Sequence, residues 1–185
     1  MWLDRAFLLI ITLFCISTVF AINDYTVDSE RWTDEYDRHF RKYSKRYFGP
    51  LFNWQWFKAQ AIAESGLNAN AVSSAGAIGL MQIMPDTFKE INDANPHFAE
   101  VNKPRWNIAA GIYYDRLLYT KFPKTPEQDR LYLALASYNA GYGTILNVSR
   151  KLQTDALLWT TVKPYLPRET RGYVGRIKRL MGNAG

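Results

Sequence analysis

Two polar side chains stand out in residues 64–85, a stretch that is otherwise mostly small or apolar. Glu64 closes an aromatic and aliphatic run that begins at Trp54, and Gln82 lies inside the apolar run 78–84. If the first run is helical, Glu64 lies near the negative end of the helix dipole and among apolar neighbours. Both conditions raise the pKa of a carboxyl group, so Glu64 is a candidate general acid. The alternative is a solvated glutamate at a frayed helix end, which is the commoner case.

Capping and breaking residues predict the elements that position Glu64. Asn53 can cap a helix through the apolar run, and Gly66 is a natural end for it, so Glu64 falls on its last turn. A connector of small residues and glycines follows. Pro85 can then open a short helix that reaches Ile91.

A helix expected after Ser29 carries an aromatic stripe. Its members share one helix face at spacings of three and four residues: Trp32, Tyr36, Phe40, Tyr43 and Tyr47. One interpretation is a ledge on which sugar rings stack. The other, which we favour, is a helix that packs on the rest of the domain.

Three more helices follow from start signals. Asn107 is a candidate N-cap, Thr125 and Gln128 form a capping box, and Pro167 can open the last helix. Segment 92–106 contains two prolines and little periodicity, which predicts a loop. Every predicted element is helical, so the expected fold class is mainly α, with an N-terminal helix before the main domain.

Four motifs occur in a fixed order along the chain. They are ES at 64–65 followed by Ser73 and GLMQIMP at 79–85, PRWNIAAGIYY at 104–114, ASYNAG at 136–141, and ETRGYV at 169–174. Together they resemble the catalytic core of the lytic transglycosylases related to the soluble lytic murein enzyme (SLT type), over residues 40–181. The resemblance implies a lysozyme-like α-helical catalytic domain with a cleft, in which Glu64 is the single catalytic acid and base.

This chain departs from the family pattern at three positions. Ala63 stands where a glutamine often precedes the glutamate, Ala69 where a proline is common, and Ser137 where an alanine is usual. None of these changes alters a functional side chain.

The resemblance also implies a set of substrate-binding residues: Ser73, Gly79, Met81, Gln82, Tyr138, Asn139, Glu169 and Tyr173. Gln82 would bind the acetamido group of the sugar or nearby oxygens, and Ser73 would orient either that group or Glu64. Gly79 would let the backbone approach the sugar closely because it has no Cβ. Met81 would line the cleft.

The C-terminal motifs allow two interpretations each. By periodicity alone, Tyr138 and Tyr173 are core tyrosines, Asn139 bonds locally at a helix end, and Glu169 pairs with a neighbouring arginine. By resemblance, both tyrosines face the catalytic glutamate, and Glu169 contacts the peptide or sugar of the substrate.

The implied reaction is the non-hydrolytic cleavage of the β-1,4 bond between N-acetylmuramic acid (MurNAc) and N-acetylglucosamine (GlcNAc), which leaves 1,6-anhydro-MurNAc ends. Ordinary glycoside hydrolysis uses two carboxyl groups. No Asp or Glu lies between Glu64 and Asp86, although Asp115, Glu127 or Glu169 could fold inward. The alternatives are a muramidase-type hydrolase with the same glutamate, and a non-catalytic wall-binding component of a secretion or lysis apparatus.

Residues 1–21 are typical of a signal peptide or a retained membrane anchor, with cleavage favoured after Ala21. The expected organisation is this leader, an N-terminal helical segment at 22–50 that packs on the domain, and the SLT-type catalytic domain at 51–185. The expected location is the periplasm or cell envelope, with an inner-membrane anchor as the alternative. Cys15 is the only cysteine, so no internal disulfide can form.

A formal net charge of +6 suits a polyanionic partner. No nucleic-acid motif accompanies this charge. The resemblance implies peptidoglycan glycan strands as the partner, and the polyanionic bacterial wall fits the positive charge. Membrane association through 1–21 and secretion-machine or other wall-enzyme partners are further options. The sequence shows no cluster of His, Cys or carboxylate at ligand spacing, so we expect neither a metal nor a cofactor.

Overall fold

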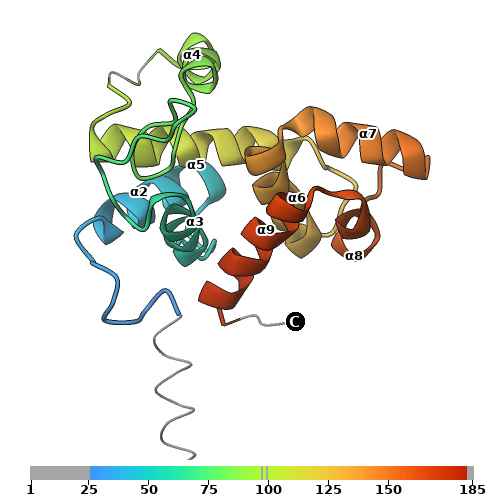
Figure 1. Ribbon diagram of the computed structural model, residues 1–185, viewed down its shortest axis with the longest axis horizontal. Helices are drawn as coiled ribbons and strands as arrows, with labels where there is room; N and C mark the ends of the chain where they lie inside the picture. The colour runs from blue at the N-terminus through green and yellow to red at the C-terminus, as the bar shows by residue number, and fades with distance from the viewer. Residues whose placement is uncertain (1–25, 97, 99, 183–185) are drawn as a thin grey trace, which may run out of the picture.

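The computed structural model describes residues 26–96, 98 and 100–182 (Figure 1). Within these residues the regular elements are all helical, which confirms the expected mainly α fold class. They are α2 (Asp37–Phe48), α3 (Gln55–Ser65), α4 (Pro85–Ala94), α5 (Pro104–Thr120), α6 (Glu127–Ala140), α7 (Tyr142–Leu152), α8 (Trp159–Val162), the 3-10 helix η1 (Lys163–Tyr165) and α9 (Arg168–Leu180).

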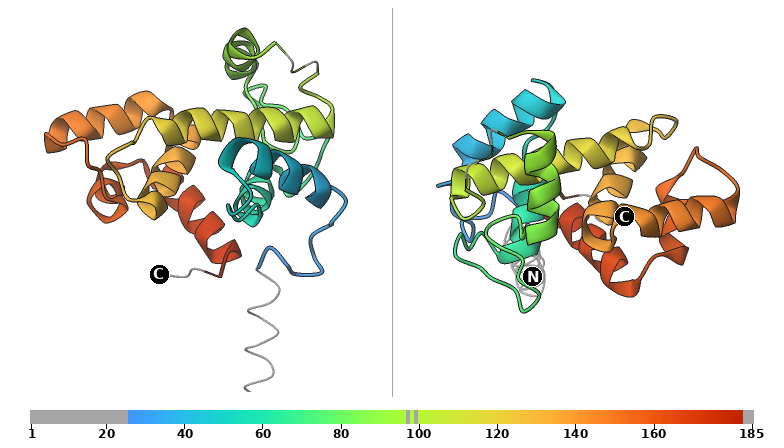
Figure 2. Two further views of the ribbon diagram at one scale, coloured as in Figure 1. Left: turned by 180° about the vertical axis from the view of Figure 1, so that it is seen from behind. Right: turned by 90° about the horizontal axis from the view of Figure 1, so that it is seen from above.

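The long helix α5 runs through the middle of the molecule (Figure 1). It contacts α2 and α4 towards one end of the molecule and α6 towards the other. Helix α9 folds back from the second group to contact both α6 and α3, and the reverse view in Figure 2 shows the same arrangement. The end of α3 and the middle of α9, far apart in sequence, therefore meet.

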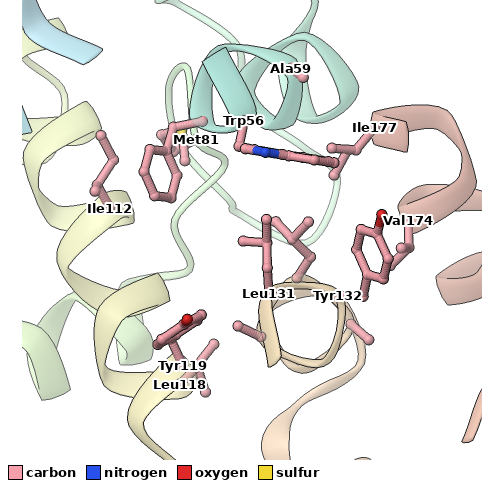
Figure 3. Packing of buried hydrophobic residues seen from close by; sticks show 14 of the residues in the cluster. Trp56, Ala59, Met81, Ile112, Leu118, Tyr119, Leu131, Tyr132, Val174 and Ile177 are labelled. Atoms are coloured by element: carbon pink, nitrogen blue, oxygen red, sulfur yellow. The ribbon is translucent and has the colours of Figure 1, made fainter. Parts of the chain in front are cut away.

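Aromatic residues of the core fix this meeting. The ring of Trp56 on α3 meets that of Tyr132 on α6 edge-on at a centroid distance of 5.9 Å. Tyr132 in turn meets Trp159 of α8, also at 5.9 Å. Figure 3 shows Trp56 and Tyr132 together with Val174 and Ile177 of α9. Because buried aromatic pairs have restricted geometry, the two ring contacts limit how α3, α6 and α8 can shift relative to one another.

The N-terminal helix starts later than predicted. Helix α2 begins at Asp37, whereas Ser29 lies in a series of turns, where its side-chain oxygen accepts from the backbone N–H of Arg31 at 3.2 Å. The prediction that Ser29 caps this helix is therefore wrong. The aromatic stripe still faces inward: Phe40 and Tyr43 are buried in the core, and the other three residues of the stripe pack against it.

An ion pair fastens α2 to the helix that carries Glu64. Lys58 of α3 lies 2.8 Å from Asp37 of α2, and its side chain is only 5% exposed. Residues of α2 also belong to the same buried cluster as the rest of the domain. Helix α2 thus packs on α3 and α5, while the boundary proposed between residues 50 and 51 stays a prediction.

Other helix boundaries follow local sequence signals to different degrees. Gly66 ends α3 in the left-handed conformation with φ 63°, and Pro85 opens α4, both as predicted. Asn53 accepts a hydrogen bond from the N–H of Gln55 at 3.0 Å, although the N-cap position is the next residue. Pro167 directly precedes α9.

Two more predicted helix starts are wrong. Helix α5 begins at Pro104, so Asn107 is a buried residue inside the helix. Helix α6 follows Pro126, and the N-cap has no side-chain hydrogen bond, so Thr125 and Gln128 do not form a capping box. Helices α7 and α8 were not predicted at all.

The predicted leader lies outside the described residues. In the part of the chain that the structure describes, no helix has both the length and the apolar character needed to cross a membrane.

Candidate active site

Glu64 lies on the last turn of α3 and is partly buried. Its Oε1 accepts a hydrogen bond from the hydroxyl of Tyr173 on α9 at 2.6 Å. Burial raises the pKa of Glu64 to about 7, and the hydrogen bond from Tyr173 opposes that rise. A carboxyl with this pKa holds a proton at neutral pH and can also release it, as a general acid and base must.

The end of α3 is held by bonds from two directions. Ser65 donates to the carbonyl of Leu80 at 2.9 Å, which joins the helix to the connector. Arg176 of α9 donates to the carbonyl of Ala63 at 3.2 Å. The bond from Arg176 satisfies a carbonyl in the last turn of α3, and the two bonds together hold the residues on either side of Glu64 in place.

The connector folds back on itself around Ile78, which forms isolated bridges with Val72 and Ile83. Within it, the side-chain oxygen of Ser73 accepts from the N–H of Ala77 at 3.0 Å. Ser73 therefore stabilises its own turn, and in the described residues it forms no hydrogen bond with Glu64. A contact from Ser73 to the substrate stays a prediction.

Gln82 has a backbone conformation that is unusual for its residue type, with φ 44°. Its side-chain nitrogen donates to the carbonyls of Gly79 at 2.9 Å and Ala71 at 3.2 Å. Left-handed conformations in residues other than glycine cost about 1–3 kcal/mol and are concentrated at functional sites. The amide of Gln82 thus holds the connector closed around the end of α3.

The connector needs glycine at position 79 because of Asn107. Gly79 has φ 76°, and a Cβ there would lie 2.6 Å from the side-chain nitrogen of Asn107. Asn107 accepts from the N–H of Met81 at 2.7 Å and donates to the carbonyls of Ile78 at 2.9 Å and Val101 at 2.8 Å. This role of Asn107 was not predicted, because its residue type was the only signal in the sequence.

Met81 differs from the expectation that it lines the cleft. Its side chain is 0% exposed and packs so closely on α5 that a Cβ at Gly111 would come within 2.8 Å of it. The backbone of Met81 is what reaches the site, since its carbonyl accepts from the hydroxyl of Tyr138 at 2.8 Å.

The two tyrosines of the C-terminal motifs both interact with the carboxyl groups of Glu64 and Asp115. The pKa of Tyr173 and that of Tyr138 are both raised well above 10, first by burial and then by the negative charges of Glu64 and Asp115. The ring of Tyr138 also meets Tyr114 of α5 at a centroid distance of 5.6 Å. Both tyrosines are therefore neutral hydrogen-bond donors at physiological pH.

Asn139 and Glu169, the remaining predicted site residues, form no hydrogen bond with Glu64 among the described residues. Asn139 accepts from the hydroxyl of Thr170 at 2.8 Å and so joins α6 to α9. Glu169 is exposed in the first turn of α9 and, among the described residues, forms no ion pair with Arg168 or Arg171. A substrate contact remains the prediction for both.

A second carboxyl group near Glu64 was not among the predicted site residues. Asp115 of α5 is 1% exposed, and its Oδ1 accepts from Nε2 of Gln60 on α3 at 3.3 Å. Its pKa is raised well above the usual value by burial, and the charge of Glu64 contributes to the rise. In the described part of the chain, no group of three or more His, Cys, Asp or Glu residues could hold a metal ion.

Comparisons with known proteins agree with this arrangement. The Transglycosylase SLT domain family matches residues 41–156. A relative from Actinobacillus pleuropneumoniae, membrane-bound lytic murein transglycosylase F, is 35% identical over 137 residues, which cover 71% of this chain and 27% of the relative.

Solved structures of similar shape belong to longer proteins as well. The 70-kDa soluble lytic transglycosylase of Escherichia coli has a TM-score of 0.69 at 26% identity, over 84% of this chain and 25% of that one. An inactive Glu→Gln mutant of lytic transglycosylase Slt from Pseudomonas aeruginosa has a TM-score of 0.69 at 25% identity, over 82% of this chain and 24% of that one. The chain thus spans about a quarter of the length of these proteins. Since the family match extends over more than half of its residues, the chain belongs to the transglycosylase SLT domain family.

Proposed function

We propose that this chain is a peptidoglycan lytic transglycosylase in which Glu64 transfers both protons of the reaction. The observation that carries the proposal is the protonation behaviour of Glu64. Its pKa of about 7 lets it hold a proton at neutral pH, while the Tyr173 hydroxyl at 2.6 Å stabilises the carboxylate that remains after that proton leaves. Membership of the SLT family supports the same activity.

In the first step, Glu64 gives its proton to the oxygen of the bond between MurNAc C1 and GlcNAc O4. That bond breaks with its electron pair on the departing oxygen, and the 2-acetamido oxygen of MurNAc stabilises the electron-deficient C1. The hydrogen bond from Tyr173 stabilises the negative charge that develops on Glu64 as the proton leaves.

In the second step, the Glu64 carboxylate takes the proton from the 6-hydroxyl of the same MurNAc. O6 then forms a bond to C1, which closes the 1,6-anhydro ring and restores protonated Glu64. This attack is intramolecular, so it needs no second carboxylate to activate water. The backbone of the connector, with Gln82, Gly79 and Ser73, is the proposed contact surface for the sugar, and Asn139 and Glu169 are proposed further contacts.

The rival reaction is hydrolysis by the same glutamate. A hydrolase needs a second carboxylate, or a comparable group, that reaches the substrate or its water. Asp115 is close enough for the charge of Glu64 to raise its pKa. Its side chain is nevertheless 1% exposed and already bonded to Gln60, which disfavours contact with the substrate or its water.

Mass spectrometry of purified sacculi digested with the protein tests the proposal. We expect muropeptides with 1,6-anhydro-MurNAc ends, which weigh one water less than the reducing-end products. Reducing ends instead of anhydro ends would identify a hydrolase. No soluble product from a folded protein would favour the non-catalytic wall-binding alternative.

The proposed location is the periplasm or cell envelope, where peptidoglycan lies. Residues 1–21 are the proposed leader, and N-terminal sequencing of the exported protein separates the two versions of this proposal. A start just after Ala21 indicates a cleaved signal peptide. A retained Met1 indicates an anchor.

A further inference from the structure

Two buried oxygen atoms behind the active site lack a partner. They are Oδ2 of Asp115 and Oε1 of Gln60, and neither has a hydrogen bond with any described residue. Both residues are almost fully buried, at 1% and 0% exposure. An unpaired buried oxygen destabilises the folded protein, and two of them in neighbouring side chains call for an explanation.

One proton accounts for both atoms. The second polar atom of each group is already bonded, because Nε2 of Gln60 donates to Oδ1 of Asp115 at 3.3 Å. A proton on Oδ2 of Asp115 turns that oxygen into a donor, and the free acceptor of its partner is Oε1 of Gln60. The carboxyl and the amide then form a ring with two hydrogen bonds and no net charge.

The surrounding charges also favour the protonated form. The ionisable groups that interact with Asp115 are Glu64 on α3, Tyr138 on α6, Tyr173 on α9 and Tyr114 on its own helix. All of these are acids, whose charged forms repel a carboxylate. Among the described residues no Lys, Arg or His forms an ion pair with Asp115, so nothing offsets the cost of burying its charge.

We propose that Asp115 is a neutral carboxylic acid paired with Gln60, and that this pair is a positioning device for Glu64. Gln60 precedes Glu64 by four residues on α3, so the two side chains lie on one helix face. The pair ties that face to α5. Since it carries no charge, it adds no repulsion when Glu64 ionises between the two proton transfers. This inference rests on the proposed role of Glu64.

Two substitutions of similar size separate positioning from proton transfer. In Asp115→Asn, an amide replaces the acid and can form the same two bonds, so anhydro-muropeptide release should stay within about threefold of the wild type, with an unaltered pH profile. Asp115→Leu leaves both polar atoms of the Gln60 amide unpaired, and release should fall about tenfold or more. An Asp115→Asn protein that folds but is as inactive as Glu64→Gln would overturn the proposal, because the acid itself would then be needed.

The protonation state can be measured without the reaction. In protein labelled with ¹³C at Asp Cγ, we expect one carboxyl signal at the shift of a protonated acid at pH 7, and its absence from Asp115→Asn. If the signal lost in Asp115→Asn titrates near the ordinary aspartate value, Asp115 is ionised and the proposal fails. This readout holds even if Asp115→Leu does not fold, and it is unaffected if the proposed transglycosylase reaction is wrong.

Stability against pH gives a second measurement of the same proton. The pKa of Asp115 is higher in the folded protein than in the unfolded chain. Its contribution to the free energy of unfolding is therefore complete below the unfolded-state pKa and is lost as pH rises toward the folded-state pKa. The measurement compares the Glu64→Gln protein with the Glu64→Gln, Asp115→Asn double variant. The ratio of the first protein's unfolding constant to the second's should rise about tenfold per pH unit between the unfolded-state and folded-state pKa of Asp115. A ratio that does not change between pH 4 and 7 contradicts the proposal.

Discussion

The hydroxyl of Tyr173 donates to Oε1 of Glu64 across 2.6 Å, and this bond joins the middle of α9 to the last turn of α3. The two residues are 109 positions apart in sequence. Burial makes the protonated form of Glu64 favourable, whereas this bond favours the ionised form. The balance of the two brings the pKa of Glu64 to about 7, close to the pH at which it would have to work.

Glu64→Gln should abolish most of the release of anhydro-muropeptides from sacculi. The amide keeps the size of the side chain but can neither give nor recover an acidic proton. General acid–base assistance contributes about a hundred- to ten-thousand-fold, and with both transfers lost we expect a fall near the upper end. Circular dichroism confirms that the variant is folded. Near wild-type release by a folded Glu64→Gln protein would refute the mechanism.

Activity should decline as pH rises through about 7, because the first step needs protonated Glu64. In Tyr173→Phe the bond that lowers the pKa of Glu64 is lost, so this decline should move to higher pH. The rate at low pH should also fall by roughly tenfold, since the carboxylate formed in the first step loses a donor. The measurement is a pH profile of initial rates for both proteins. An unmoved decline would show that another group sets it.

The same pKa predicts how stability depends on pH. Glu64 has a folded-state pKa of about 7 against 4.5 in the unfolded chain, so its stabilising contribution is lost as pH rises through 7. Glu64→Gln has no such loss, so its stability relative to the wild type should increase by up to about 3 kcal/mol between pH 4 and pH 8. Urea unfolding at pH 4 and pH 8 compares the two proteins. A difference that is the same at both pH values would show that Glu64 is not desolvated.

Much of the site could be predicted from local sequence because its central feature is local. The apolar run, Asn53 and Gly66 place Glu64 on the last turn of a helix, and the structure has it there. Tyr173 could be named only from a family motif, since periodicity gave it as a core residue. Its position opposite Glu64 depends on how α9 packs, which no short window of sequence contains.

What could not be predicted are the polar groups that pair across the core. Gln60 and Asp115 are separated by 55 residues, and each alone is an ordinary polar residue on a helix. Asn107 has the residue type of an N-cap, yet its side chain binds the connector, because tertiary contacts offered it three partners there. The role of Asn107 follows from burial of the backbone, whose donors and acceptors must find partners, whereas the pairing of Gln60 with Asp115 depends on how α3 and α5 meet.

Activity on whole sacculi should fall as salt rises. The chain has a formal net charge of +6, and the proposed substrate is polyanionic. Since the screening length shortens from about 14 Å to 6 Å between roughly 0.05 and 0.3 M salt, we expect a loss of roughly two- to fivefold over this range. A short neutral glycan is the matched control and should change much less. Equal salt sensitivity on both substrates would remove the electrostatic explanation.

Gly79→Ala should destabilise the protein and distort the connector beside Glu64. The new Cβ would lie 2.6 Å from the Asn107 side chain, and the residue would keep a φ of 76° that alanine disfavours. Strain and overpacking together should cost about 2–4 kcal/mol.

Gly143→Ala in α7 is the matched control, because no atom lies within 4 Å of its Cβ position and its φ is not positive. Alanine is the better helix former, so this variant should gain up to about 1 kcal/mol. Urea unfolding compares both variants with the wild type. If Gly79→Ala is as stable as Gly143→Ala, the connector does not need glycine at position 79, and its contact with Asn107 is not what holds the backbone of the site.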